Sequence, residues 1–289
     1  MVLKKLKVMF RLAHKIAALA KYIYISLYFR VKHPFIVRVN KKNILSSTPY
    51  NSANFTYNKI VSDLFSPNTY FSEYGQDFYL SSLLINYIRN NPDSWVVDVG
   101  AGEPEFLSNS LYFETYYGCR TLAIDPLDEF KILWEEERPA ANFIDSAIGA
   151  NEGKAKLMVP NNIDSMLSFV SDEKHEFSEL EFSQRIVPLR TLANIFNENE
   201  IHVVMMLSID VAGNEFEVLK GIDFSNVEIK TIVLGNKLPS IVGSEDVRNF
   251  LIKKNYVFIA RLGDSDDVFI HQSMINGIPE LTYQSATTI

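Results

Sequence analysis

The sequence predicts an α/β protein in which a mostly parallel, doubly wound sheet ends in an antiparallel edge hairpin. Short and continuously apolar runs, which are typical of strands buried on both faces, alternate with segments of helical spacing. The last two apolar runs are joined by the short polar stretch "LGDSD", which is typical of a hairpin turn. The single cysteine, Cys119, excludes an internal disulfide framework and a cysteine-rich zinc site.

The same pattern predicts the individual elements in order. The first predicted helix, Tyr79–Arg89, has helical apolar spacing and ends at "NNPD". The other predicted helices are Ser108–Tyr117, "FKILWEEE", a helix that begins with Glu215–Lys220, and "EDVRNFLIKKN". The predicted strands are Trp95–Val99, Thr121–Ile124, Asn142–Ile148, "VVMMLSIDV" up to Asp210, "IKTIVLGN", Tyr256–Ala260 and Asp267–His271.

The N-terminal segment, residues 1–62, is basic, whereas the rest of the chain is acidic. No Asp or Glu precedes Asp63, and 12 of the 28 Lys and Arg lie in residues 1–62. Residues 63–289 carry 16 Lys and Arg against 35 Asp and Glu, a net charge of −19. We therefore expect an N-terminal arm and linker, residues 1–62, followed by one α/β domain, residues 63–289.

The arm has the spacing of an amphipathic helix. Its apolar residues recur at steps of three and four, from Leu3 to Leu27, and lysines and arginines interrupt them. One interpretation is a helix that lies on an anionic membrane surface; the alternative is a helix packed on the domain with its bases in water. No run of eighteen apolar residues predicts a spanning helix. We expect a cytoplasmic protein, peripheral to the inner face of a membrane, and no nucleic-acid partner, because the acidic domain repels phosphate.

Acids stand in or after four of the predicted strands. They are Asp98, Asp125, Asp145 and Asp210. In an open α/β sheet, ligands bind beyond the carboxyl ends of the strands. A single acid after a strand is a common helix cap, but four acids together indicate a binding site.

The turn "GAGEPE" after the first strand selects the kind of ligand. Gly100 and Gly102 begin a dinucleotide-type turn, but Glu105 replaces the third glycine, and Glu103 and Glu105 would repel a pyrophosphate. S-adenosylmethionine carries no phosphate and a positive sulfonium. Asp98 would organise its amino acid end, Asp125 would accept its ribose hydroxyls, and Asp145 with Ser146 would lie at its adenine.

The order of short motifs along the chain resembles the FkbM family of methyltransferases from about Tyr70 to Ile270. These motifs are "YGQD", "VDVGAGEP", "SNS", "AIDP", "SAIGA", "LSIDVAGNEFEVLKGIDF", "IVLGN" and "ARLGDSDDVFI". The resemblance implies a Rossmann-like class I methyltransferase fold and methyl transfer from S-adenosylmethionine to a hydroxyl of a glycan or secondary metabolite. It adds Pro126 and Gln76 to the cofactor-binding residues Asp98, Gly100, Gly102, Asp125, Asp145 and Ser146. No histidine spacing predicts a metal site.

The chain departs from the family at two acids. The family usually reads Asp-Val-Glu-Gly after the fourth strand and Glu-Asn after the fifth, whereas this chain has Ala212 and Gly235 at the two Glu positions. Asp210 and Glu215 remain as candidate catalytic residues, because an oxygen nucleophile needs a base to take its proton. The alternative is a catalytically impaired protein that keeps cofactor binding and lacks the acceptor-side acids.

Overall fold

The computed structural model describes residues 70–161, 168–170, 182–236, 244–262 and 266–275. The predicted N-terminal arm lies outside the described residues, as do residues 263–265 of the predicted hairpin turn. Within the described ranges, no helix is long and apolar enough to cross a membrane.

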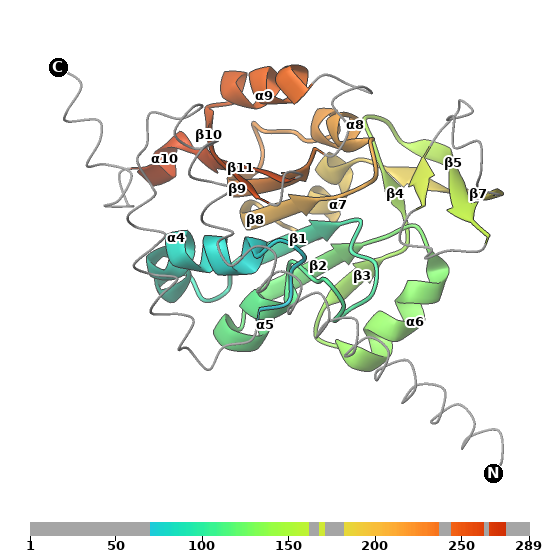
Figure 1. Cartoon of the computed structure of the whole chain (residues 1–289), viewed down its shortest axis with the longest axis horizontal. Coiled ribbons are helices and arrows are strands. Elements are labelled where there is room, and N and C mark those ends of the chain that lie inside the picture. The colour runs from blue at the N-terminus through green and yellow to red at the C-terminus, as the bar shows by residue number, and fades with distance from the viewer. Residues whose placement is uncertain (1–69, 162–167, 171–181, 237–243, 263–265, 276–289) are drawn as a thin grey trace, which may run out of the picture.

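A seven-stranded sheet forms the centre of the molecule, with the order β10-β11-β9-β8-β1-β2-β3 (Figure 1). The five strands β9, β8, β1, β2 and β3 are parallel, and β11 and β10 add an antiparallel pair at one edge. This confirms the mostly parallel sheet and the edge hairpin. The strand bounds are β1 (Trp95–Val99), β2 (Arg120–Ile124), β3 (Asn142–Ile144), β8 (Val203–Ile209), β9 (Glu228–Gly235), β10 (Tyr256–Leu262) and β11 (Asp266–His271).

Helices cover both faces of this sheet (Figure 1). The helices α4 (Gln76–Asn90), α5 (Leu111–Tyr117) and α6 (Asp128–Glu137) lie on one side. The helices α7 (Leu192–Glu198), α8 (Glu215–Lys220) and α9 (Ser244–Lys253) pack against the other. The short helix α10 (Gln272–Ile275) follows β11. The strands β1, β2, β8 and β9 are therefore buried on both faces over most of their length, which explains why they are continuous, mostly apolar runs.

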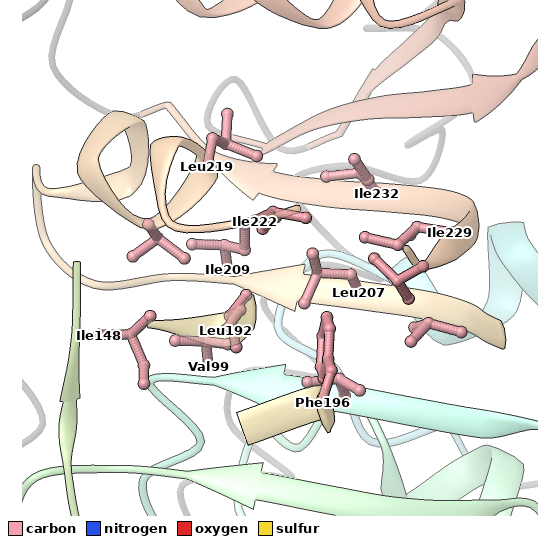
Figure 2. Close-up of a cluster of buried hydrophobic side chains, with 14 of the residues drawn as sticks. Val99, Ile148, Leu192, Phe196, Leu207, Ile209, Leu219, Ile222, Ile229 and Ile232 are labelled. Atoms are coloured by element: carbon pink, nitrogen blue, oxygen red, sulfur yellow. The ribbon is translucent and has the colours of Figure 1, made fainter. Parts of the chain in front are cut away.

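The larger core lies between the sheet and the helices α7 to α9. Figure 2 shows Leu207 and Ile209 of β8 among side chains from β1, β9, α7 and α8. Leu207 and Ile209 are completely buried, as is Val97 of β1. This packing fixes the ends of β1 and β8, from which the loops of the candidate site start.

The prediction of a single strand over Asn142–Ile148 is wrong, because the structure has two strands there. β3 ends at Ile144, and β4 (Ala147–Ile148) belongs to a second sheet with the order β4-β7-β5-β6. The remaining strands of that sheet are β5 (Gly153–Pro160), β6 (Phe169–Val170) and β7 (Phe182–Arg190), none of which the apolar pattern predicted. Asp145 and Ser146 connect β3 of the first sheet to β4 of the second.

Candidate functional site

A pocket lies at the carboxyl ends of β1, β2 and β8. Its lining includes Val99 and Gly100 from β1 and the following turn, Asp125 and Pro126 after β2, and Asp210 after β8. The second sheet contributes a further wall with Ile148, Leu157 and Val170, and Ser168, directly before β6, also lines the pocket. The structure therefore brings together several residues that the sequence predicted separately, namely Gly100, Gly102, Asp125, Pro126, Ser146 and Asp210.

The charge of the pocket is negative. Among the described residues that line it, Asp125 and Asp210 are the charged side chains, and no Lys, Arg or His is present. The other lining groups are mostly apolar. Such a lining suits a ligand that joins a cationic group to a flat apolar group, and it disfavours a phosphate. Within the described ranges, no group of three or more His, Cys, Asp or Glu side chains could hold a metal ion.

The turn after β1 depends on two glycines in the left-handed region. Gly100 has φ 81° and Gly102 has φ 55°. The N–H groups of Gly100 and Ala101 donate to the carbonyl oxygen of Ile124, at 2.9 and 3.1 Å. A Cβ at position 100 would lie 2.0 Å from the carbonyl oxygen of Asp210. The turn thus presses the loop after β1 against the loop after β8, which only glycine allows.

Asp125 holds two segments of backbone at the rim of the pocket. Its Oδ2 accepts from the N–H of Gly102 at 3.1 Å, and its Oδ1 accepts from the N–H of Leu127 at 2.9 Å. Burial raises the pKa of Asp125 to about 6, and these two hydrogen bonds oppose that rise. Both oxygens keep lone pairs for further donors, since a carboxylate accepts about four hydrogen bonds.

Asp98 does not line the pocket, and it is buried within a polar network. Burial raises its pKa to about 6, whereas the nearby guanidinium of Arg138 and the hydroxyls of Ser208 and Ser110 lower it. Arg138, only 3% exposed, also donates to the carbonyl oxygen of Pro104 at 2.8 Å and forms an ion pair with Glu114 at 2.6 Å. The network therefore supports the turn that follows β1.

The predicted adenine pair, Asp145 and Ser146, separates in the structure. Ser146 lines the pocket, and its hydroxyl donates to the carbonyl oxygens of Ala147 and Pro188. Asp145 does not line the pocket. Its side chain is 49% exposed and forms an ion pair with Lys131 at 3.3 Å.

The loop after β8 carries both predicted catalytic residues in different settings. Asp210 lines the pocket. Glu215 does not, and its Oε1 accepts from the N–H groups of Gly213 at 3.0 Å and Val211 at 3.3 Å. Burial raises the pKa of Glu215, and the negative charge of Asp210 adds to the rise. Glu215 thus closes the loop on itself. Ala212, with φ 54°, is exposed at its tip.

Gln76 lies at the start of α4, outside the pocket lining. Its Nε2 donates to Asp266 Oδ2 at 2.5 Å, and its Oε1 accepts from the N–H of Tyr74 at 2.9 Å. Both Gln76 and Asp266 are buried. Gln76 therefore joins α4 to the start of β11, on the β9 side of the sheet.

Sequence reasoning missed two groups that shape the site. One is Arg138, which follows three glutamates and carries no apolar signal of its burial. The other is the wall from the second sheet, because the alternation of β5 and β7 was not recognised. The pattern "KAKLMV" within β5 alternates between exposed and buried residues and could have indicated a half-buried strand.

Comparison with known proteins identifies the family. Residues 98–258, more than half of the chain, match the model of the methyltransferase FkbM domain. The matched segment begins at Asp98 in β1 and includes the pocket residues that follow β1, β2 and β8. No curated protein and no solved structure matches the chain. The chain belongs to the FkbM family of methyltransferases.

Proposed function

We propose that this protein transfers a methyl group from S-adenosylmethionine to a hydroxyl oxygen of a glycan or a secondary metabolite. The observation that carries this proposal is the pocket itself, a mostly apolar lining in which, among the described residues, the charged side chains are the carboxylates of Asp125 and Asp210. Such a lining fits a cationic, phosphate-free cofactor better than a dinucleotide. The sheet order, with β8 between β1 and β9 and the hairpin at the edge, supports a Rossmann-like class I methyltransferase fold.

The residues of the chain fit this cofactor in a definite arrangement. Asp125 would accept the two ribose hydroxyls, the backbone at Gly100 and Gly102 would allow the amino acid end to approach, and Asp98 would support that turn. Ser146 and the apolar wall of the second sheet would flank the adenine. The bound cofactor supplies an electrophilic methyl group on its sulfonium.

The protein's own chemical task is then to orient the acceptor and to take its proton. Asp210 is the acid on the β8 side of the pocket, so we assign it as the general base for the acceptor hydroxyl. Glu215 was also predicted as catalytic. Its contacts with the backbone of the same loop favour a different role, in which it holds Val211 and Gly213, the residues that follow Asp210, in place.

Two measurements test this function. Calorimetric titration with S-adenosylmethionine and with its demethylated product is expected to give binding of both. Transfer of a tritiated methyl group to a panel of methyl glycosides, phenols and aliphatic alcohols is expected to identify an acceptor class. Absence of binding by both cofactor forms would refute the proposal.

A second candidate function is a cofactor-binding protein with little or no methyl transfer. The observation that favours it is the pair Ala212 and Gly235, where the family usually has glutamates. This candidate expects normal cofactor binding, poor turnover, and a gain of activity when both glutamates are introduced. The gain would be about 10²–10⁴-fold if one of them is a general base.

We also propose that the N-terminal arm, residues 1–62, attaches the 63–289 domain to the anionic inner face of a membrane in the cytoplasm. The support is its sequence, an acid-free segment with 12 Lys and Arg and an amphipathic pattern. Deleting residues 1–30 should release the protein from anionic vesicles at low salt. If the full-length protein does not bind such vesicles, the alternative of a helix packed on the domain is favoured.

A further inference from the structure

β9 ends at Gly235, and the carboxylate of Asp210 lies where a side chain at this position would be. A Cβ at Gly235 would lie 2.9 Å from Oδ1 and 3.3 Å from Cγ of Asp210. The parallel register of β8 and β9, with Ile209 opposite Leu234, places these two residues side by side just beyond the pair. The carboxylate of Asp210 therefore leans across the end of β9, into the space that a side chain at position 235 would need.

Two further acids, Asp266 and Asp267 of β11, lie on the other side of Gly235 and contact polar side chains. Asp266 of β11 is the register partner of Gly235, and Gln76 donates to its carboxylate. Asp267 is completely buried and pairs with Arg248 and Arg261, at 2.9 and 2.7 Å. Neither acid lines the pocket, whereas Asp210 does. Of these three acids, Asp210 is thus the one that reaches both the pocket and the end of β9.

We propose that Gly235 is a positioning residue for Asp210, and that the missing side chain is what lets the carboxylate of Asp210 stand at the acceptor side of the pocket. This inference rests on the proposed methyl transfer. It also gives a different interpretation of the glutamate that the family usually has at position 235. A glutamate and the observed conformation of Asp210 compete for one space, so the glycine reflects an exchange of one carboxylate for another rather than the loss of an acid.

The contact also determines what a substitution would do. The backbone of Gly235 lies outside the left-handed region, so alanine brings no backbone strain there. The atom that a new Cβ meets is the far end of a side chain. The chain can relieve the overlap by rotating Asp210 away, which preserves the fold and misplaces the base. A general base must lie within about 2.6–3.2 Å of the group whose proton it takes.

The test compares Gly235→Ala with a matched control, Gly149→Ala. A Cβ at Gly149 would also make a close contact, 3.2 Å from Leu189 Cδ1, without positive φ and away from Asp210. The acceptor is the best substrate of the panel of methyl glycosides, phenols and aliphatic alcohols. For Gly235→Ala we expect kcat to fall by about 10²-fold while the Kd for S-adenosylmethionine changes by less than about threefold. Gly149→Ala should keep both values.

A double-mutant cycle separates positioning from a general structural effect. Asp210→Asn keeps the shape of the side chain and removes the base. If Gly235→Ala acts through Asp210, the double variant should be no slower than Asp210→Asn alone. Independent losses that multiply would overturn the inference and leave the proposed function intact. A crystal structure of Gly235→Ala should show the Asp210 side chain rotated away, and an unmoved carboxylate would also overturn it.

The glutamate variant decides between this inference and the impaired protein. We expect Gly235→Glu to reduce methyl transfer, alone or with Ala212→Glu. If the unmodified chain binds S-adenosylmethionine but transfers no methyl group, and the two glutamates restore transfer, the positioning role is refuted. If S-adenosylmethionine does not bind at all, the proposed function fails and this inference fails with it.

Discussion

The carbonyl oxygen of Asp210 lies 2.0 Å from the position that a Cβ on Gly100 would occupy. Gly100 directly follows β1 and Asp210 directly follows β8, and the N–H of Asp210 donates to the carbonyl oxygen of Val99 at 2.9 Å. The loops that carry the cofactor-side turn and the proposed base are therefore in backbone contact. Any displacement of one loop moves the other.

This contact predicts a large effect for Gly100→Ala. The new Cβ meets backbone, which cannot rotate away, and the residue would keep a φ of 81°. Left-handed strain and overpacking together should lower the free energy of unfolding by about 2–4 kcal/mol and weaken S-adenosylmethionine binding. Urea unfolding and calorimetry measure the two effects. Gly118→Ala is the control, because Gly118 has φ 67° and its Cβ would meet nothing within 4 Å. An equal loss of stability in both variants would mean that strain alone is responsible.

We expect Asp125 to contribute strongly to the affinity for S-adenosylmethionine. Asp125→Asn keeps one carbonyl oxygen for a backbone N–H and removes the charge that would strengthen hydrogen bonds from the ribose. Loss of two charge-assisted hydrogen bonds should weaken S-adenosylmethionine binding by about 2–4 kcal/mol. Asp128→Asn, whose carboxylate is 85% exposed on α6, should bind as the unmodified chain does. Unchanged affinity in a folded Asp125→Asn protein would refute the ribose assignment.

Continuous apolar runs made the central sheet predictable. Each of its strands β1, β2, β8 and β9 is buried on both faces, so the run itself marks the strand. β7 could not be recognised in this way. It is mostly solvent-exposed, it contains Pro188, and its sequence "FSQRIVPLR" has the composition of a loop.

Of the acids at strand ends, only some line the pocket. Asp125 and Asp210 follow strands near the centre of the sheet, and the structure places both in the pocket. Asp145 follows β3, the edge strand, where its side chain turns to solvent and Lys131. Sequence alone does not say which strand is at the edge. Nor does it indicate that Arg138 is buried, because burial of a charge depends on partners from distant segments.

The buried acids predict how cofactor affinity depends on pH. Burial raises the pKa of Asp125 and of Asp98 to about 6. Hydrogen bonds donated by ribose favour the ionised form of Asp125, so binding becomes linked to loss of its proton. The affinity for S-adenosylmethionine should fall as the pH drops below 6, by about tenfold between pH 7 and pH 5. Calorimetry across this range measures it, and Asp125→Asn should flatten the profile.

Titration of Asp98 and Asp125 would not cause a loss of affinity at pH 5 by unfolding the protein. The two carboxyl groups bind protons more tightly in the folded chain than in the unfolded chain, whose Asp pKa is near 3.8. Their contribution to stability therefore increases as the pH falls from above 6 toward 4 and is lost as the pH rises through 6. Urea unfolding at pH 5 and pH 7 checks the sign for these groups, because the double variant Asp98→Asn, Asp125→Asn should lose this part of the pH dependence. An affinity that does not change between pH 7 and pH 5 would contradict the linkage.

Glu215 provides a prediction that separates positioning from proton transfer. One of its carboxylate oxygens accepts from the N–H groups of Val211 and Gly213, and Glu215→Gln can keep that acceptor. If Glu215 holds the loop, Glu215→Gln should stay within about threefold of the unmodified kcat, whereas Glu215→Ala should lose about 10-fold or more as the loop opens and Asp210 moves. If Glu215 is instead the base, both variants should lose about 10²–10⁴-fold, because neither can take a proton. Glu217→Gln, on the outer side of α8 beside Lys220, serves as the control and should leave kcat unchanged. Kinetics with the best acceptor of the panel, together with thermal unfolding of each variant, decide between the two roles.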